Sequence, residues 1–132
     1  MSEPLTRRNA GVLLHPSSLP GAGYCGGFGE EARRFVDLVA AAGLQIWQVL
    51  PLGPTHEDGC PYQSFSVHAG NPDLIDLQWL VQHGWLSESE AREGLADGRA
   101  RRGALSRACK VFHAELDREP DAPMAQLYRL FL

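Results

Sequence analysis

The chain has 132 residues, of which 44% are hydrophobic and 21% are charged. This balance is typical of a soluble globular protein, but the length excludes a complete (β/α)8 barrel, which needs about 250 residues. No apolar run approaches the roughly 20 residues of a membrane span, and we expect no signal peptide because the N-terminal residues lack an apolar core. The net charge of −4 gives no electrostatic argument for binding nucleic acid.

Cysteine usage indicates the redox environment. The three cysteines, Cys25, Cys60 and Cys109, form no Cys-x-x-Cys pair. An odd number of widely spaced cysteines favours neither a zinc site nor a disulfide framework. We therefore expect reduced thiols in a cytoplasmic protein.

A strand, a helix and a second strand are predicted within the first fifty residues. The apolar runs at 11–14 and 46–50 are each followed closely by a proline and are typical of buried strands. Between them, residues 30–42 carry apolar side chains at helical spacing, and Gly43 fits the position just after a helix. This order predicts a βαβ unit whose two strands are parallel and buried on both faces.

A long loop and several helices are predicted after this unit. Residues 52–72 show no periodicity, and loops of this length in compact domains often bind ligands. Further along, Ser87 and Glu90 have the spacing of a capping box at the start of a helix. We expect the glycines that follow, up to position 103, to interrupt the helical pattern before a second amphipathic helix at 105–116.

A glycine motif lies between the first strand and the first helix. Gly21, Gly23 and Gly26 match G-x-G-x-x-G, as in dinucleotide-binding proteins. However, residues 16–20 separate the strand from these glycines, and no acidic residue ends the second strand to hold a ribose. A small nucleotide-binding domain is thus an alternative hypothesis, and a glycine-rich connector is the interpretation we favour.

Two polar groups resemble catalytic or metal sites only superficially. His15 with Ser17 could pair a base with a nucleophile, but the two residues are too close in sequence for a triad layout, so we expect them to hydrogen-bond the loop backbone. His56, Glu57 and Asp58 are adjacent, and adjacent residues rarely converge on one ion. We expect a solvated loop tip there and no metal site.

Residues 60–66 form the stretch with the clearest binding chemistry. Tyr62 offers a flat apolar face with a hydroxyl group, a combination that suits a sugar ring, while Gln63, Ser64 and Ser66 can hydrogen-bond sugar hydroxyls. Packing of the aromatic ring against the rest of the domain fits the same pattern equally well. The strand ends carry no carboxylate pair of the kind that glycoside chemistry needs.

Three blocks of the sequence resemble the bacterial 4-α-glucanotransferases, the amylomaltases of glycoside hydrolase family 77. The resemblance is strong over residues 9–86, whereas residues 87–132 are similar to the family only as a variable helical insertion. The blocks are GVLLHPSSLPG at 11–21, WQVLPLGPT at 47–55, and PYQSFS at 61–66 with AGNP at 69–72.

The resemblance implies a TIM (β/α)8 barrel decorated by helical insertions. Residues 1–86 would be the first two β/α units of that barrel, and residues 87–132 the start of an insertion, where we expect the chain to be truncated. The implied reaction transfers α-1,4-glucan segments to the 4-hydroxyl of an acceptor glucan or glucose, through a covalent glucosyl-enzyme with retention. It implies a maltooligosaccharide or α-1,4-glucan partner, with no metal or organic cofactor, no nucleic acid and no membrane.

The resemblance also assigns roles to individual residues. It implies that the catalytic carboxylates lie beyond residue 132, so no catalytic residue is assigned in this chain. Tyr62 is the implied sugar-contacting aromatic on the donor side of the glucan cleft, Gly59 and Cys60 are weaker contacts, and Asn71 fixes the loop. Cys60 stands where the family usually has serine, which is a better hydrogen bonder.

An alternative reading is that this polypeptide is a non-catalytic gene remnant or a sugar-binding fragment. We expect the isolated chain to be inactive on maltotriose because no catalytic carboxylate is assigned to it. We also expect it to be poorly folded, because an open two-stranded sheet leaves edges and apolar faces exposed.

Overall fold

The computed structural model describes residues 8–21, 23, 25–56, 58–66 and 68–131. The chain divides into two compact units, Met1–Asp76 and Leu77–Leu132. The division falls before Leu77 because Leu77, Leu80, Trp85 and Leu86 are buried in the core of the second unit.

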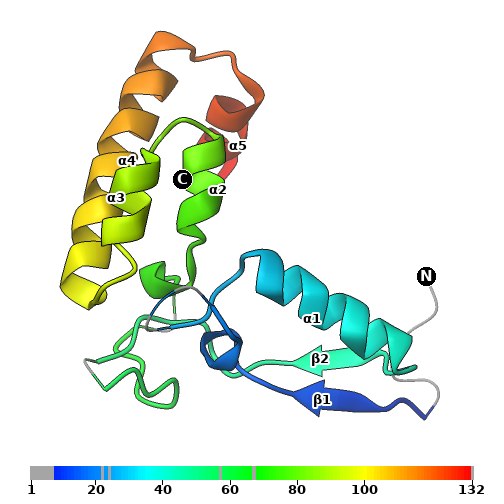
Figure 1. Cartoon of the computed structure of the whole chain (residues 1–132). Coiled ribbons are helices and arrows are strands. Elements are labelled where there is room, and N and C mark those ends of the chain that lie inside the picture. Colours follow the sequence, from blue (N-terminus) through cyan, green and yellow to red (C-terminus); the bar gives the residue numbers. More distant parts are fainter. Residues whose placement is uncertain (1–7, 22, 24, 57, 67, 132) are drawn as a thin grey trace. The chain divides into compact units, whose positions relative to one another are not determined.

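The first unit is built around a parallel βαβ arrangement (Figure 1). Gly11 lies opposite Ile46, and Leu13 lies opposite Gln48. The predicted parallel pairing is therefore confirmed. The elements of this unit are strand β1 (Gly11–Leu13), 3-10 helix η1 (Pro16–Ser18), helix α1 (Glu30–Ala41), strand β2 (Ile46–Gln48) and 3-10 helix η2 (Pro72–Leu74).

Helix α1 follows the predicted pattern closely. Of its apolar stripe, Ala32 and Val39 are buried. The ring of Phe35 meets the indole of Trp47 edge-on, with the ring centroids 5.0 Å apart. The helix ends where Gly43 adopts a φ of 73°, a left-handed conformation that favours glycine.

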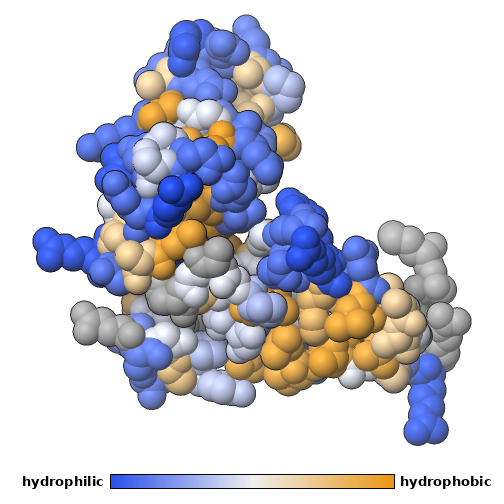
Figure 2. All heavy atoms as spheres, viewed as in Figure 1, coloured by the Kyte–Doolittle hydropathy of each residue, from blue (hydrophilic) through white to orange (hydrophobic). Residues whose placement is uncertain are grey.

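The strands are less buried than predicted. Side chains alternate across a strand, so Val12 and Trp47 share the face that meets α1, while Leu13 and Ile46 share the opposite face. Leu13 is 53% exposed and Ile46 is 37% exposed. The prediction of strands buried on both faces is wrong for the described part of the chain, and Figure 2 shows apolar atoms gathered over this βαβ region.

The second unit is a small helical assembly with its own core. Two alanines of its longest helix, Ala104 and Ala108, are almost completely buried, which allows the neighbouring helices to approach closely. Trp85 is also buried, and its indole N–H donates to Glu115 Oε2 over 2.7 Å. The helices are α2 (Leu77–Gln82), α3 (Glu88–Glu93), α4 (Gly98–Arg118) and α5 (Pro123–Phe131).

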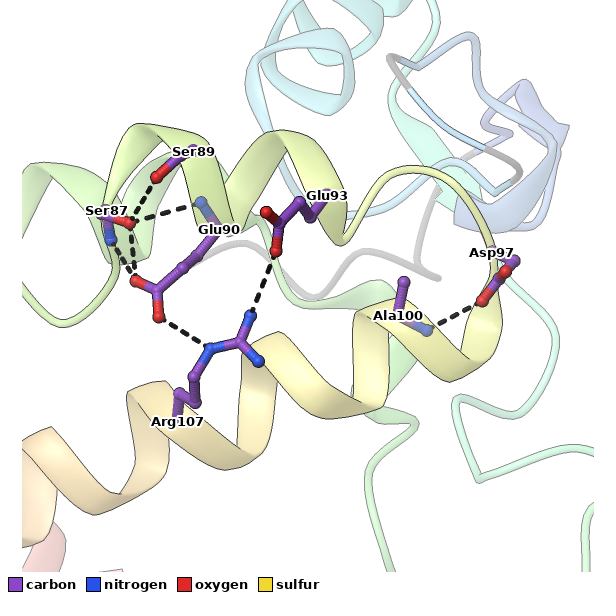
Figure 3. Close-up of polar contacts among 7 residues, drawn as sticks. All are labelled: Ser87, Ser89, Glu90, Glu93, Asp97, Ala100 and Arg107. Atoms are coloured by element: carbon purple, nitrogen blue, oxygen red, sulfur yellow. Dashed lines mark hydrogen bonds and ion pairs between the residues drawn. The ribbon is translucent and has the colours of Figure 1, made fainter.

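The predicted capping box at the start of α3 is confirmed (Figure 3). The Ser87 hydroxyl accepts the Glu90 N–H at 3.3 Å, and the Glu90 carboxylate accepts the Ser87 N–H at 2.9 Å. Arg107 of α4 pairs with the same carboxylate, with Nε 2.7 Å from Oε1. Hydrogen bonds from Ser87, together with the Arg107 charge, hold the pKa of Glu90 below its ordinary value of 4.5.

The predicted interruption by glycines is correct at Gly94, which caps the end of α3, and wrong at Gly103. Helix α4 begins at Gly98, where Asp97 Oδ1 accepts the Ala100 N–H at 2.8 Å, and it continues through Gly103. A glycine inside a helix costs only about 1 kcal/mol. The cap and the burial of the Ala104 side of the helix outweigh that cost. Within the described residues, no helix is long and apolar enough to cross a membrane.

Candidate functional site

The candidate site lies on the loop that leaves the C-terminal end of β2. The connector carrying η1 leaves the C-terminal end of β1, so the two segments emerge from the same edge of the parallel sheet. The strand ends are tied together there, because the Trp47 indole donates to Leu14 O over 2.7 Å. This edge is where parallel α/β folds place their binding loops.

The base of the loop is closed by backbone pairing. Thr55 and Ser64 form an antiparallel bridge, and the Phe65 N–H donates to Pro54 O over 3.3 Å. The Asn71 N–H donates to Leu52 O over 2.8 Å. These contacts bring the two ends of the loop together.

Two consecutive turns form the tip of the loop. The Gly59 N–H donates to His56 O over 3.0 Å, and Gly59 has a φ of 67°, which favours glycine. The Gln63 N–H then donates to Cys60 O over 3.1 Å. Proline and tyrosine are the two central residues of this second turn, and proline suits the first of them.

The three predicted sugar-contacting residues lie together on this tip. Tyr62 is 76% exposed, so its ring is available to a ligand. Gly59 is exposed, and Cys60 is a half-buried free thiol. A second aromatic ring, Phe65, is 65% exposed and lies 5.4 Å from the His56 ring, measured between centroids.

The serines of the loop are used to fold it. Ser64 Oγ donates to Ser66 O over 2.7 Å, and Ser66 Oγ accepts the N–H groups of His68 and Ala69 at 3.3 and 3.2 Å. The expected sugar hydrogen bonds would have to compete with these contacts. Asn71 caps η2 through a 2.9 Å bond from the Asp73 N–H, in agreement with its predicted loop-fixing role.

His15 binds the local backbone, as predicted. Its Nδ1 lies 2.7 Å from Ser17 Oγ and accepts the Ser17 N–H at 3.3 Å, which caps η1. The side chain is buried, and its Nε2 has no hydrogen-bond partner in the described part of the chain.

The glycine motif packs as a connector. A Cβ atom on Gly26 would lie 2.4 Å from Leu19 O and 2.5 Å from Pro16 O, and the Gly26 N–H already donates to Ser17 O over 3.0 Å. This glycine is therefore used to pack against η1, which favours the connector over a phosphate-binding loop. Residues 22 and 24 of the motif lie outside the described residues.

The side chains of His56 and Asp58, the adjacent polar residues near the loop tip, also make structural contacts. Asp58 Oδ1 accepts the Cys60 N–H at 3.1 Å, and the ring of His56 packs against Phe65. Glu57 lies outside the described residues. Across the residues that the structure describes, no group of three or more His, Cys, Asp or Glu side chains is placed to hold a metal ion.

Comparison with known proteins identifies the family. A family model described as 4-alpha-glucanotransferase matches residues 14–129. The chain belongs to the 4-alpha-glucanotransferase family, glycoside hydrolase family 77.

Relatives of this glucanotransferase-family chain occur in bacteria and plants. The 4-alpha-glucanotransferase of Thermus thermophilus is 49% identical over 98 residues, covering 74% of this chain and 19% of that protein. The enzyme of the same name from Streptococcus pneumoniae serotype 4 is 43% identical over 120 residues, covering 82% and 24%. A chloroplastic/amyloplastic 4-alpha-glucanotransferase of Arabidopsis thaliana is 48% identical over 88 residues, covering 67% and 15%.

A solved structure extends the likeness to the fold. It is an amylomaltase from Streptococcus agalactiae in complex with acarbose, with a TM-score of 0.76 and 35% sequence identity. The match covers 92% of this chain and 26% of that chain. This glucanotransferase-family chain therefore spans about a quarter or less of the length of these relatives.

One residue at the base of the loop was missed by the sequence analysis. Gly53 is buried where the two ends of the loop meet, and its neighbours are the backbone and side chain of 64–66. The sequence does contain a signal, because Gly53 lies between Pro51 and Pro54 in one of the family-like blocks. A glycine between two rigid residues indicates a place where another segment approaches closely.

Proposed function

We propose that the protein containing this chain is a 4-α-glucanotransferase, which transfers α-1,4-glucan segments to the 4-hydroxyl of an acceptor glucan or glucose. The observation that carries the proposal is the family match over residues 14–129. Relatives of the same name in bacteria and plants, and an amylomaltase solved with acarbose, support it.

In this proposal, the first unit is the beginning of a TIM barrel. Its parallel strands β1 and β2 carry exposed apolar side chains, Leu13 and Ile46, on the face that α1 does not cover. Both faces of the sheet in such a barrel are buried, so this exposed face is one that the rest of the barrel would cover. The helices within residues 87–132 would belong to a helical insertion.

The mechanism proposed for the whole protein is the retaining one. A carboxylate attacks the anomeric carbon while a carboxylic acid protonates the departing glycosidic oxygen. The 4-hydroxyl of the acceptor then displaces the enzyme carboxylate and gives its proton to the second carboxyl group, which the first step left ionised. We assign these carboxyl groups beyond residue 132 and none within this chain. Only carboxyl groups take part, so the reaction requires no metal or organic cofactor.

Within this mechanism, the chain contributes to holding the donor glucan. Tyr62 would place its exposed ring against the face of a glucose unit, with Gly59 and Cys60 in contact from the adjoining turns. Its 76% exposure at the tip of a closed loop supports this role. The partner is a maltooligosaccharide or α-1,4-glucan. Three widely spaced cysteines with no Cys-x-x-Cys pair support a cytoplasmic location.

Incubation of the full gene product with maltotriose tests the proposal. A transferase forms one glycosidic bond for each bond that it breaks, so we expect glucose and longer maltodextrins to accumulate with no rise in total reducing ends. A rise in reducing ends without longer products would identify a hydrolase, and no conversion would refute the proposal. We expect no glucose from the 132-residue chain alone, and its release there would contradict our placement of the catalytic groups.

A further inference from the structure

We propose that Gly53 and Ser64 form the seat that fixes the Tyr62 loop, so that Gly53 is a positioning residue for the glucan contact. This inference rests on the proposed function, because it takes Tyr62 as a sugar-contacting residue. The seat itself is a property of the loop base and can be tested separately.

The approach at the seat is too close for any side chain at position 53. A Cβ atom on Gly53 would lie 2.2 Å from Ser64 Oγ and 2.4 Å from Ser66 O. A hydroxyl can rotate away, but the Ser66 carbonyl is backbone and cannot move without moving its segment. Substitution of Gly53 must therefore separate the segment 52–54 from the segment 64–66.

Those two segments determine where Tyr62 lies. Ser64 is two residues after Tyr62 and forms the bridge with Thr55 that closes the loop. Its hydroxyl donates to Ser66 O over 2.7 Å and accepts the Ser66 N–H at 3.4 Å, which fixes the local bend. Any displacement of Ser64 away from Gly53 is thus carried directly into the turn that presents Tyr62.

Gly53→Ala in the full gene product tests the seat, with Gly70→Ala as the matched control. Gly70 belongs to the same loop, is exposed, and has no atom within 4 Å of an added Cβ. Ser64→Ala is a milder second variant that removes the hydroxyl contacts and leaves the backbone space unchanged. The readouts are hydrogen–deuterium exchange of peptides covering 55–64, and KM and kcat for maltotriose.

We expect Gly53→Ala to speed exchange at 59–63 and to raise KM by at least roughly fivefold, with kcat much less affected, since lost ground-state binding appears in KM. Ser64→Ala should also speed loop exchange and raise KM, but by less. Gly70→Ala should leave both the loop exchange and KM unchanged. Exchange in α4 serves as the folding control, because a local effect leaves the second unit unchanged.

Three results would overturn the proposal. Loop exchange and KM in Gly53→Ala equal to those in Gly70→Ala would show that no seat exists. A fall in kcat at constant KM would indicate only a smaller amount of folded protein. Faster loop exchange, combined with an unchanged KM in Tyr62→Ala, would remove the glucan role of Tyr62 and hence the positioning role. If the unsubstituted protein does not convert maltotriose, the proposed function fails, and loop exchange still decides whether the seat exists.

Discussion

Tyr62 contributes little to the packing of the fold. With 76% of the residue exposed, its ring buries little apolar area in the described structure. The polar contacts that fold its loop involve the backbone and the side chains of Asp58, Ser64 and Ser66. A large exposed ring on a loop closed in this way is well suited to contact a ligand.

Replacement of Tyr62 by alanine should therefore affect function and not stability. An aromatic ring stacked on a flat ligand is worth about 1–3 kcal/mol, by analogy with base–aromatic pairs, so we expect kcat/KM for maltotriose to fall roughly 5- to 150-fold. The melting temperature should stay unchanged, and Tyr62→Phe, which keeps the ring, should retain most of the activity. An unaltered kcat/KM in Tyr62→Ala would exclude this residue from the glucan site.

The roles of single residues were predictable where they depend on near neighbours. His15 and Asn71 bind backbone groups two residues away, as expected from sequence. The use of Ser64 and Ser66 within the loop was not expected, and neither was the close approach at Gly53. The serine contacts are local, but a serine hydroxyl can equally bind a sugar, so the residue type does not decide between the two uses. The approach at Gly53 depends on which distant segment lies alongside, and the sequence does not specify this.

At the scale of elements, helix starts were easier to predict than helix continuity. The capping box at Ser87 is a four-residue pattern that also forms in the structure. Helix α4 instead runs through Gly103, because its alanine face is buried against neighbouring helices. Tertiary burial outweighed local propensity there, and sequence periodicity did not reveal it.

Two glycine substitutions in the second unit should have opposite effects. An added Cβ at Gly103 would meet only Arg107 Nη1, at 3.6 Å, so Gly103→Ala should raise the free energy of unfolding by about 0.5–1 kcal/mol. An added Cβ at Gly94 would lie 2.8 Å from Leu77 Cδ1 and 3.1 Å from Ala104 Cβ. Gly94→Ala should therefore lower the free energy of unfolding by about 1–3 kcal/mol. Urea unfolding followed by circular dichroism measures both, and equal effects would contradict the packing described here.

The capping box predicts a dependence of stability on pH. The pKa of Glu90 is lower in the folded protein than its ordinary value of 4.5, so its stabilising effect is complete above that value and is lost as the pH falls through the folded pKa. Ser87→Ala should cost about 1 kcal/mol at neutral pH by removing the cap. It should also flatten the fall in stability as the pH drops below 4.5, because the Glu90 pKa returns towards its unfolded value.

Chemical denaturation at a series of pH values measures this effect. Ser106→Ala, an exposed substitution within α4, is the control and should leave both the stability and its pH profile almost unchanged. Identical acid profiles for the unsubstituted protein and Ser87→Ala would show that the capping box does not set the Glu90 pKa.

At the scale of the molecule, both units leave some apolar side chains exposed, including Leu127 and Leu130 in the second, and they differ in their cores. The second unit has a continuous core around Trp85 and Ala104. The first unit leaves Leu13 and Leu38 more than half exposed, and the two strands of its sheet each have an edge without a partner in the described residues. Exposed apolar surface of this kind contributes nothing to folding of the chain itself.

The first unit should consequently open before the second in the 132-residue chain. We expect the amides of β1 and β2 to exchange at lower urea concentrations than those of α4, because fewer buried apolar contacts hold them. Hydrogen exchange measured as a function of urea concentration distinguishes the amides of the two strands from those of α4. Simultaneous exchange of both would show that the chain unfolds as a single cooperative unit.

The βαβ topology followed from sequence because the apolar runs, the helical stripe and Gly43 are all local signals. The burial of the strands did not follow. Leu13 and Ile46 have the residue types of a buried strand, but whether they are covered depends on what packs against that face. The sequence therefore predicted that the strands are apolar, and the structure was needed to show that the described residues leave one face open.

A crystal structure of the full gene product with bound acarbose would show whether the loop tip around Tyr62 contacts an α-1,4-glucan. We expect the Tyr62 ring within about 4 Å of a sugar ring, with Gly59 or Cys60 beside the same sugar. Acarbose bound elsewhere, with the Tyr62 ring still facing solvent, would contradict this expectation.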